Sequence, residues 1–257
     1  SKEKLGIDLL INPEDAVAEE LFKLACTSRA FDVAEFAEGQ IHFQGYRITE
    51  DSPICNLTLA ELGELRGIYR FVIVAIHRGK TTIIPRGEDS IQAGDRIYIF
   101  AHQNELPAIN YLLRPGEKEC KTSKQRAFIL GGSRIGLQIA QNMERQSIST
   151  KLIEKNEERC YKLAEELNKA VVINAEGLDL QTLLDEGMED ADVFVAVTDN
   201  DQTNILTCLL AKQHSVKRTL ALVSQPELID LASELGIDAC VSPRMAAAST
   251  ILKFVRR

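Results

Sequence analysis

The second half of the chain alternates short apolar runs with longer amphipathic segments. Between the runs, apolar residues recur at helical spacing, as in Ile135, Ile139 and Met143. Because the runs are almost wholly apolar, we expect helices on both faces of the sheet that they form. The pattern predicts an α/β lobe built on a doubly wound parallel sheet. The predicted strands are residues 127–130, 150–154, 170–174, 192–198, 219–223 and 237–241.

The first half of the chain has shorter elements separated by turn residues. Gly79 and the Gly94-Asp95 pair mark turns between apolar runs, which predicts a small α+β lobe over residues 30–114. Within it, Arg78, Arg86 and Asp95 are interpreted as turn and surface residues. The predicted elements are a helix at 58–65, two strands within 70–85, a strand within 91–101 and a helix at 104–113.

A sequence pattern occurs twice, 230 residues apart. "GIDLLINPEDAVA" begins at Gly6 and "GIDACVSPRMAAA" begins at Gly236. Each reads as a buried strand, a helix cap at Asn12 or Ser242, and a proline at the first helical position. The spacing predicts a tandem repeat, with the chain opening near the end of one unit.

The helix predicted after the first copy, residues 13–29, carries Val17, Leu21 and Leu24 on one stripe. This apolar surface favours either ordinary core packing or a crossover onto a partner subunit.

Composition narrows the classes of function. A net charge of −8 and a pI near 5.2 argue against binding nucleic acid or anionic lipid through a broad basic face. No apolar run approaches the roughly 18 residues of a membrane-spanning helix, so direct lipid insertion is not expected. The six cysteines and four histidines are scattered without metal-ligand spacing, which favours reduced thiols and no metal site.

Three predicted strand ends carry residues suited to a nucleotide. Gly131 to Gly136 follow the first strand and open a helix, whose N-terminal amides favour phosphate. Glu154 ends the second strand, 23 residues after Gly131, where an acid binds a ribose hydroxyl. The pair Thr198-Asp199 ends the fourth strand at the same edge. Together they predict a nucleotide site where the strand order reverses.

These motifs resemble those of a known family. "FILGGSRIGLQIA", "KLIEKNEERCYKLAEEL", "DADVFVAVTDNDQTNILTCLLAK" and "GIDACVSP" look like the nucleotide-binding lobe of RCK domains, the regulators of potassium conductance. "VAIHRGKTTIIPRGEDSIQAGDRIYIF" is similar to the small RCK C-lobe. The layout is most similar to the tandem-RCK regulatory subunits of bacterial Trk potassium uptake systems. The resemblance implies a truncated first nucleotide lobe at 1–29 (its last strand and crossover helix), a C-lobe at 30–114, a linker at 115–126, a second nucleotide lobe at 127–243 and the start of a second crossover helix at 244–257.

The resemblance also implies a function. It indicates a cytoplasmic, non-enzymatic regulatory subunit, peripheral on the inner face of the cell membrane, that controls an integral-membrane potassium transporter subunit. We expect it to bind NAD or NADH, or else ATP or ADP, and to form a homo-oligomer through its crossover helices. The alternative is a nicotinamide-dependent oxidoreductase, but the sequence shows no recognisable proton donor or substrate pocket for one.

The family's binding positions fall on identifiable residues here. Three departures matter. Ser133 stands where the middle glycine is usual, and Leu222 where an arginine commonly faces the phosphates. The third strand ends in residues 174–177, "NAEG", which also differ from the usual pattern. These differences predict weaker binding. The residues carried over are Gly131, Gly132, Ser133, Arg134, Ile135, Glu154, Glu176, Thr198 and Asp199.

Overall fold

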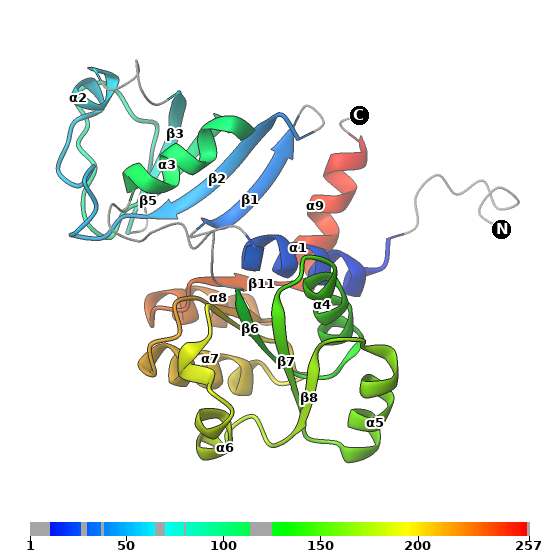
Figure 1. The fold of residues 1–257 in the computed structure, drawn as a ribbon. Coiled ribbons are helices and arrows are strands. Elements are labelled where there is room, and N and C mark those ends of the chain that lie inside the picture. The colour runs from blue at the N-terminus through cyan, green and yellow to red at the C-terminus, as the bar shows by residue number, and fades with distance from the viewer. Residues whose placement is uncertain are drawn as a thin grey trace, which may run out of the picture. The chain divides into compact units, whose positions relative to one another are not determined.

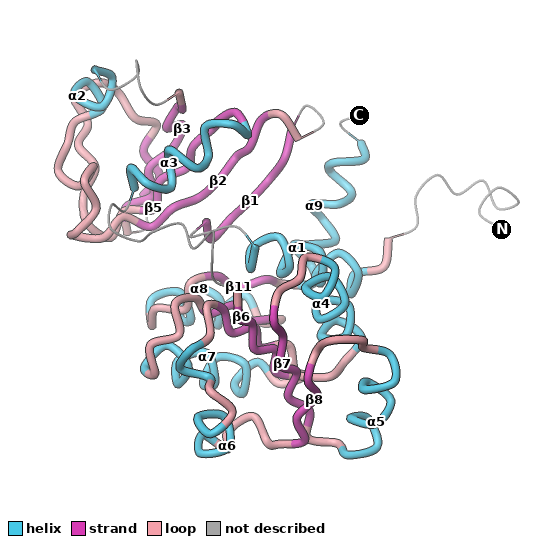
Figure 2. Tube along the Cα trace, in the orientation of Figure 1, coloured by secondary structure: helices cyan, strands magenta, loops and turns pink. Residues whose placement is uncertain are grey.

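The chain forms two compact units, seen in a computed structural model (Figure 1). One unit takes in Ser1–Cys26 and Thr122–Arg257, and the other takes in Thr27–Lys121. Figure 2 shows the strands of each unit in magenta. The structure describes residues 11–26, 30–36, 39–64, 70–79, 81–113 and 125–255.

The larger unit contains the predicted doubly wound sheet. Its strand order within the described residues is β11-β10-β9-β6-β7-β8, and every neighbouring pair is parallel. The α/β prediction is therefore confirmed. One predicted strand, 192–198, ends earlier, because the Thr198 N–H donates to a side chain instead of to the ladder. The strands are β6 Arg126–Leu130, β7 Ser149–Glu154, β8 Val171–Asn174, β9 Val193–Ala196, β10 Thr219–Leu222 and β11 Ala239–Val241.

Helices cover this sheet on both faces. In α4 the stripe of Ile135, Ile139 and Met143 is buried, as the periodicity predicts. Side chains cap the N-termini of α4 to α7, which satisfies amides that a helix start leaves free. The helices are α4 Arg134–Arg145, α5 Glu157–Glu166, α6 Leu180–Asp185, α7 Asp201–Gln213, α8 Pro226–Glu234 and α9 Pro243–Val255, with a 3-10 turn, η4, at Met188–Asp190.

The helix α1, Pro13–Cys26, belongs to the larger unit. Its Val17, Leu21 and Leu24 are buried, and the helix packs on α4, α9 and the half-sheet β9–β11 (Figure 1). Right-handed crossovers put α4 and α5 on one face over β6–β8, and α7 and α8 on the other over β9–β11. The α4 face of β9–β11 is thereby open to α1. The apolar stripe of α1 is therefore packed within the chain, as the core-packing alternative expects. The strand predicted before it falls largely on residues outside the described ranges.

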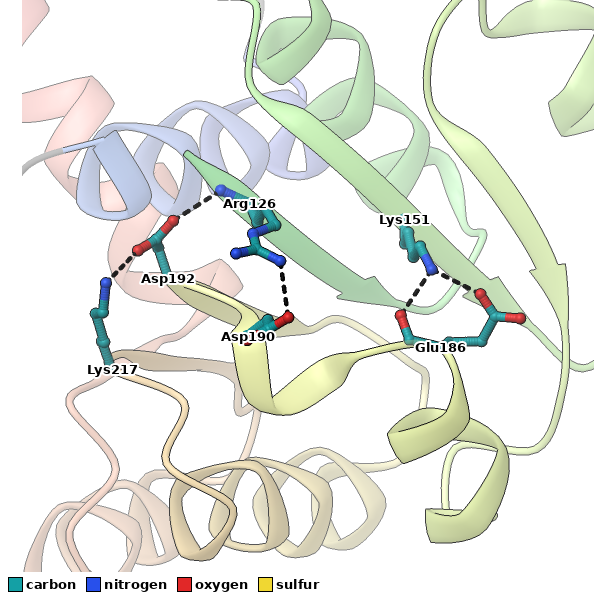
Figure 3. A network of polar contacts seen from close by, with 6 residues as sticks. All are labelled: Arg126, Lys151, Glu186, Asp190, Asp192 and Lys217. Carbon is teal, nitrogen blue, oxygen red and sulfur yellow. Dashed lines mark hydrogen bonds and ion pairs between the residues drawn. The ribbon is translucent and has the colours of Figure 1, made fainter. Parts of the chain in front are cut away.

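Ion pairs hold the amino ends of the central strands, away from the predicted site (Figure 3). Asp192 accepts a bond from the Arg126 backbone N–H at 2.8 Å and pairs with Lys217 at 2.6 Å. The Arg126 guanidinium pairs with Asp190 at 2.9 Å. Arg126 thus opens β6, although the predicted linker extended to 126; residues 115–124 lie outside the described ranges.

A second contact in Figure 3 ties β7 to the turn after α6. The Lys151 ammonium donates to the Glu186 backbone carbonyl and pairs with its carboxylate at 2.7 Å. The same ammonium lies 5.8 Å from the centre of the Phe128 ring, within the range of a cation–π contact. Lys151 therefore serves the packing of this edge.

The smaller unit is an antiparallel sheet with two helices in its described part. The strand order is β1-β2-β5-β3-β4. The sequence predicted β3, β4, β5 and both helices, but not the hairpin of β1 and β2. The elements are β1 Ala30–Phe36, β2 Ile41–Arg47, α2 Leu59–Glu64, β3 Phe71–Arg78, β4 Thr81–Ile83, β5 Arg96–His102, the 3-10 turn η3 Gln103–Glu105 and α3 Leu106–Leu113.

The interpretation of Asp95 as a surface residue is wrong. Asp95 is 1% exposed, and the Arg78 guanidinium donates to its two oxygens at 2.8 and 2.7 Å. Its carboxylate also accepts the Gln92 N–H at 2.8 Å. Arg78 and Asp95 therefore stabilise the turn before β5 from within, whereas Arg86 is exposed as expected.

Candidate functional site

A cavity of about 430 Å³ opens at the carboxyl ends of β6, β7, β8 and β9. All the predicted site residues except Arg134 and Ile135 line it. This is the edge of a doubly wound sheet at which ligands bind. The cavity residues are 130–133, 153–156, 159, 175–178, 197–200 and 203.

Two glycines make the turn after β6 possible. Gly131 has φ +110°, and a Cβ there would lie 2.9 Å from the Val197 carbonyl group. A Cβ on Gly136 would lie 1.9 Å from the Gly131 oxygen. Ser133 has φ −63°, which any residue adopts, and its Oγ accepts the Gly136 N–H at 3.5 Å as the cap of α4. The turn therefore accepts serine at this position and uses its hydroxyl.

The side chains of Arg134 and Ile135 point elsewhere. The Arg134 guanidinium pairs with Asp15 at 3.1 Å and with Glu14 at 3.7 Å, both in the first turn of α1. Ile135 is buried in the core. Only the backbone amides of these two residues, at the start of α4, remain as candidates for contact with a ligand.

Glu154 is held in place at the end of β7. Its Oε2 accepts the Gly132 N–H at 2.8 Å, and its Oε1 accepts the Asn156 N–H at 2.8 Å. A Cβ on Gly132 would lie 2.8 Å from Oε2, so glycine at 132 permits this approach. Each oxygen has lone pairs left over, which suits a carboxylate that accepts bonds from ribose hydroxyls.

A buried amide organises the end of β9. The Asn204 side chain is 0% exposed and accepts the Thr198 N–H and Oγ–H at 2.9 and 2.7 Å. It donates to the carbonyls of Thr198 and Leu222 at 3.1 and 2.9 Å. Asp201, one turn earlier on α7, accepts the N–H groups of Ser224 and Gln225 at 3.0 Å. The first turn of α7 thus fixes the ends of β9 and β10.

Asn204 and Asp201 were not predicted from the sequence. Their signal was two polar side chains on the stripe of α7 that also carries Ile205 and Cys208, which are buried. The structure also changes the interpretation of Leu222. Its side chain is 7% exposed and does not line the cavity, so an arginine there would enter the core.

Lys155, Arg159 and Leu178, which were not predicted from the sequence, form the remaining wall together with the predicted Glu176. The Arg159 Nε–H donates to the Gly132 carbonyl at 2.8 Å, and an Nη lies 3.6 Å from Glu166. Lys155 lines the cavity nearby, and Glu176 and Leu178 come from the loop after β8.

The described ranges hold neither a cluster of metal ligands nor a helix suited to a membrane. Histidine, cysteine and carboxylate side chains there do not gather in threes as a metal site requires. Among those same ranges, every helix is too short or too polar to cross a bilayer.

Two family models match the chain. The TrkA-C domain matches residues 43–113, and the TrkA-N domain matches residues 127–243. The Trk system potassium uptake protein TrkA of Azorhizobium caulinodans is 34% identical over all of this chain, which covers 56% of that protein. The TrkA protein of Halomonas elongata is 33% identical over 99% of the chain and 55% of its own length. The chain thus spans about half the length of these curated relatives.

Solved structures agree on the fold. The RCK domain of GsuK superposes with a TM-score of 0.64 at 21% identity, over 97% of this chain and 52% of that one. A GsuK channel bound to NAD gives 0.64 at 20% identity, over 99% and 44%. The chain therefore carries a TrkA-C domain followed by a TrkA-N domain, and it is similar over its whole length to Trk system potassium uptake proteins.

Proposed function

We propose that this chain is a nucleotide-sensing regulatory part of a potassium uptake system. Its TrkA-N lobe binds NAD(H) or an adenine nucleotide, and it controls an integral-membrane potassium transporter subunit from the cytoplasmic side, as a peripheral protein without catalytic activity. The observation that carries the proposal is Glu154, which Gly132 and Asn156 hold at the cavity beside the start of α4. A helix N-terminus for phosphate and a fixed carboxylate for ribose are the two contacts that a nucleotide needs.

The relatives support the same proposal. The proteins that match over the whole chain are Trk system potassium uptake proteins, and a channel of the same fold has been solved bound to NAD. Because this chain spans about half of the relatives' length, we propose the transporter partner for the complete protein. We also propose that another nucleotide lobe precedes α1 in the complete protein, with α1 as the crossover helix that leaves it and packs on the larger unit.

The contact between α4 and α1 would transmit a change in nucleotide binding from the site to α1. The α4 helix begins at the cavity, and its first residue, Arg134, pairs with the first turn of α1. Phosphate binding at the start of α4 would act on the contact between α4 and α1. A change in nucleotide occupancy would thereby reach the lobe that precedes α1.

We propose that the chain forms a homo-oligomer through its crossover helices, with α9 supplying an exposed apolar contact. The repeat that opens α1 also opens α9, yet Met245, Ile251 and Leu252 are 65%, 48% and 51% exposed. By analogy with α1, this face would cover the β9–β11 half of another nucleotide lobe. In a dimer of this chain, replacing Ile251 and Leu252 together by serine should lower the mass in light scattering. An unchanged dimer mass would refute this interface.

Calorimetry with three nucleotides tests the nucleotide site. Because the Glu154 carboxylate would face the 2′-phosphate of NADP, we expect NAD and ADP to bind at least about tenfold more tightly than NADP. Glu154→Gln should narrow that difference. Equal binding of NADP by the unaltered chain would contradict the assignment of Glu154. A change in nicotinamide absorbance on adding small alcohols or acids would favour the oxidoreductase alternative instead.

A further inference from the structure

The cavity lacks the aromatic side chains that commonly stack on a nucleotide base. Among the described residues that line it, none is a phenylalanine or a tyrosine, and the chain has no tryptophan. A purine therefore needs a planar or apolar partner of another kind. Two side chains on the β7–β8 side, beyond Glu154, meet this need.

The first is Arg159, whose guanidinium plane is held at two points. Its Nε–H donates to the Gly132 carbonyl at 2.8 Å, and an Nη lies 3.6 Å from the Glu166 carboxylate. Arg159 is the third residue of α5, and it lines the cavity beside Glu154, the proposed ribose contact. A guanidinium fixed in this way offers a flat cationic face, which is attracted to the π-face of an aromatic ring.

The second is Leu178, which is 51% exposed although it is apolar and lines the cavity. The loop that carries it is closely tied to its surroundings. The Asn174 side chain donates to the carbonyls of Glu154 and Lys155 at 3.0 Å. A Cβ on Gly177 would lie 2.7 Å from the Leu130 side chain, so the loop lies directly on the end of β6. This apolar group is therefore held at the cavity in a defined place.

Arg159 and Leu178 come from different strand ends. Arg159 follows β7 on α5, and Leu178 follows β8 just before α6 (Figure 1). We propose that the two side chains form a base clamp, in which the guanidinium stacks on one face of a purine and the leucine covers the other. The ligand class is then a purine nucleotide, and the base contributes to affinity separately from the phosphate and ribose contacts. This inference rests on the proposed function, because it concerns the same cavity.

The test compares two ligands that differ only by the base, AMP and ribose 5-phosphate, by calorimetry on the full chain. The unaltered chain should bind AMP at least about tenfold more tightly. Arg159→Lys keeps the charge and removes the plane, and Leu178→Ala removes the apolar cover. Each should weaken AMP binding about three- to thirtyfold and leave ribose 5-phosphate binding unchanged. Lys155→Gln is the matched control, since it removes a neighbouring charge without a planar group, and it should not alter the ratio of the two affinities.

Three results would overturn the clamp. One is an AMP affinity that neither Arg159→Lys nor Leu178→Ala changes. Another is an equal loss for both ligands in Arg159→Lys, which would assign Arg159 to the phosphate turn through Gly132. The third is that AMP, ADP and NAD all fail to bind the unaltered, folded chain, and this result alone would also refute the proposed nucleotide site.

Discussion

Replacing Asn204 by leucine should destabilise the larger unit while keeping nearly the same side-chain volume. The change removes four hydrogen bonds at the ends of β9 and β10. The Leu222 carbonyl is buried and would lose a partner, at a cost of about 1–3 kcal/mol. The Thr198 groups are partly exposed and can turn to water, so their loss adds only about 1 kcal/mol in total. The expected decrease in the free energy of unfolding is about 2–4 kcal/mol.

Hydrogen exchange measured by mass spectrometry suits this prediction, because the chain has two units and need not unfold in one step. Amides of β9 and β10 that exchange only through opening of the larger unit should exchange roughly 30- to 700-fold faster in the variant. Peptides from β2 and β5 in the smaller unit should exchange as before and serve as an internal reference.

Asn200→Ala is the matched control, at the N-cap of the same helix. Asn200 is an exposed cap that accepts the Thr203 N–H at 2.7 Å, so its loss should cost only about 1 kcal/mol. If Asn204→Leu changed the exchange of β9 and β10 no more than Asn200→Ala does, the buried amide would not have the role inferred here. An equal acceleration in β2 and β5 would also refute the reasoning, because it would show a general loss of structure.

Three further variants test other parts of the argument. Gly136→Ala should abolish nucleotide binding and lower the melting temperature of the larger unit, since its Cβ would lie 1.9 Å from the Gly131 oxygen; unchanged calorimetry would contradict this geometry. Burial raises the pKa of Glu144, but backbone N–H bonds from residues 168–170 outweigh it and hold that pKa below its usual 4.5. Its stabilisation is thus present above pH 4.5 and lost as the pH falls through the lowered pKa, and Glu144→Gln should remove this part of the acid dependence in thermal melts. Asp95→Ala should destabilise the smaller unit by about 1–3 kcal/mol, because the Gln92 N–H and the partly exposed Arg78 guanidinium lose their acceptor. Hydrogen exchange in β5 measures this loss, and an unchanged rate would show that Asp95 does not stabilise the turn.

The features that the sequence predicted well depend on neighbours along the chain. The strands of the larger unit are runs of apolar residues, and helix stripes such as Ile135, Ile139 and Met143 follow the 3.6-residue period. The glycines of the turn after β6 reflect a local backbone requirement, which Gly131 shows with its φ of +110°. Glu154 follows from a fixed spacing within one strand–helix–strand unit. In each case the physical cause lies within about 30 residues of the chain.

The hairpin of β1 and β2 could not be predicted from neighbouring residues along the chain. β1 is an edge strand with the sequence "AFDVAEF", in which acidic residues interrupt the apolar pattern. Its pairing with β2, and that of β2 with the distant β5, makes these segments strands. Strand propensity depends on such neighbours, and a single segment does not reveal them.

Tertiary structure also decided how individual polar groups are used. Asp95 is buried because Arg78, 17 residues away, is folded onto it, and Arg134 is drawn to Asp15, 119 residues away. Asn204 is recognisable as the organiser of β9 and β10 only when Leu222 lies beside it. Periodicity and spacing report which face of an element is apolar and where a turn must bend. The partner of a charge or an amide is set by packing between distant segments, and this packing determined which of the predicted site residues face the cavity.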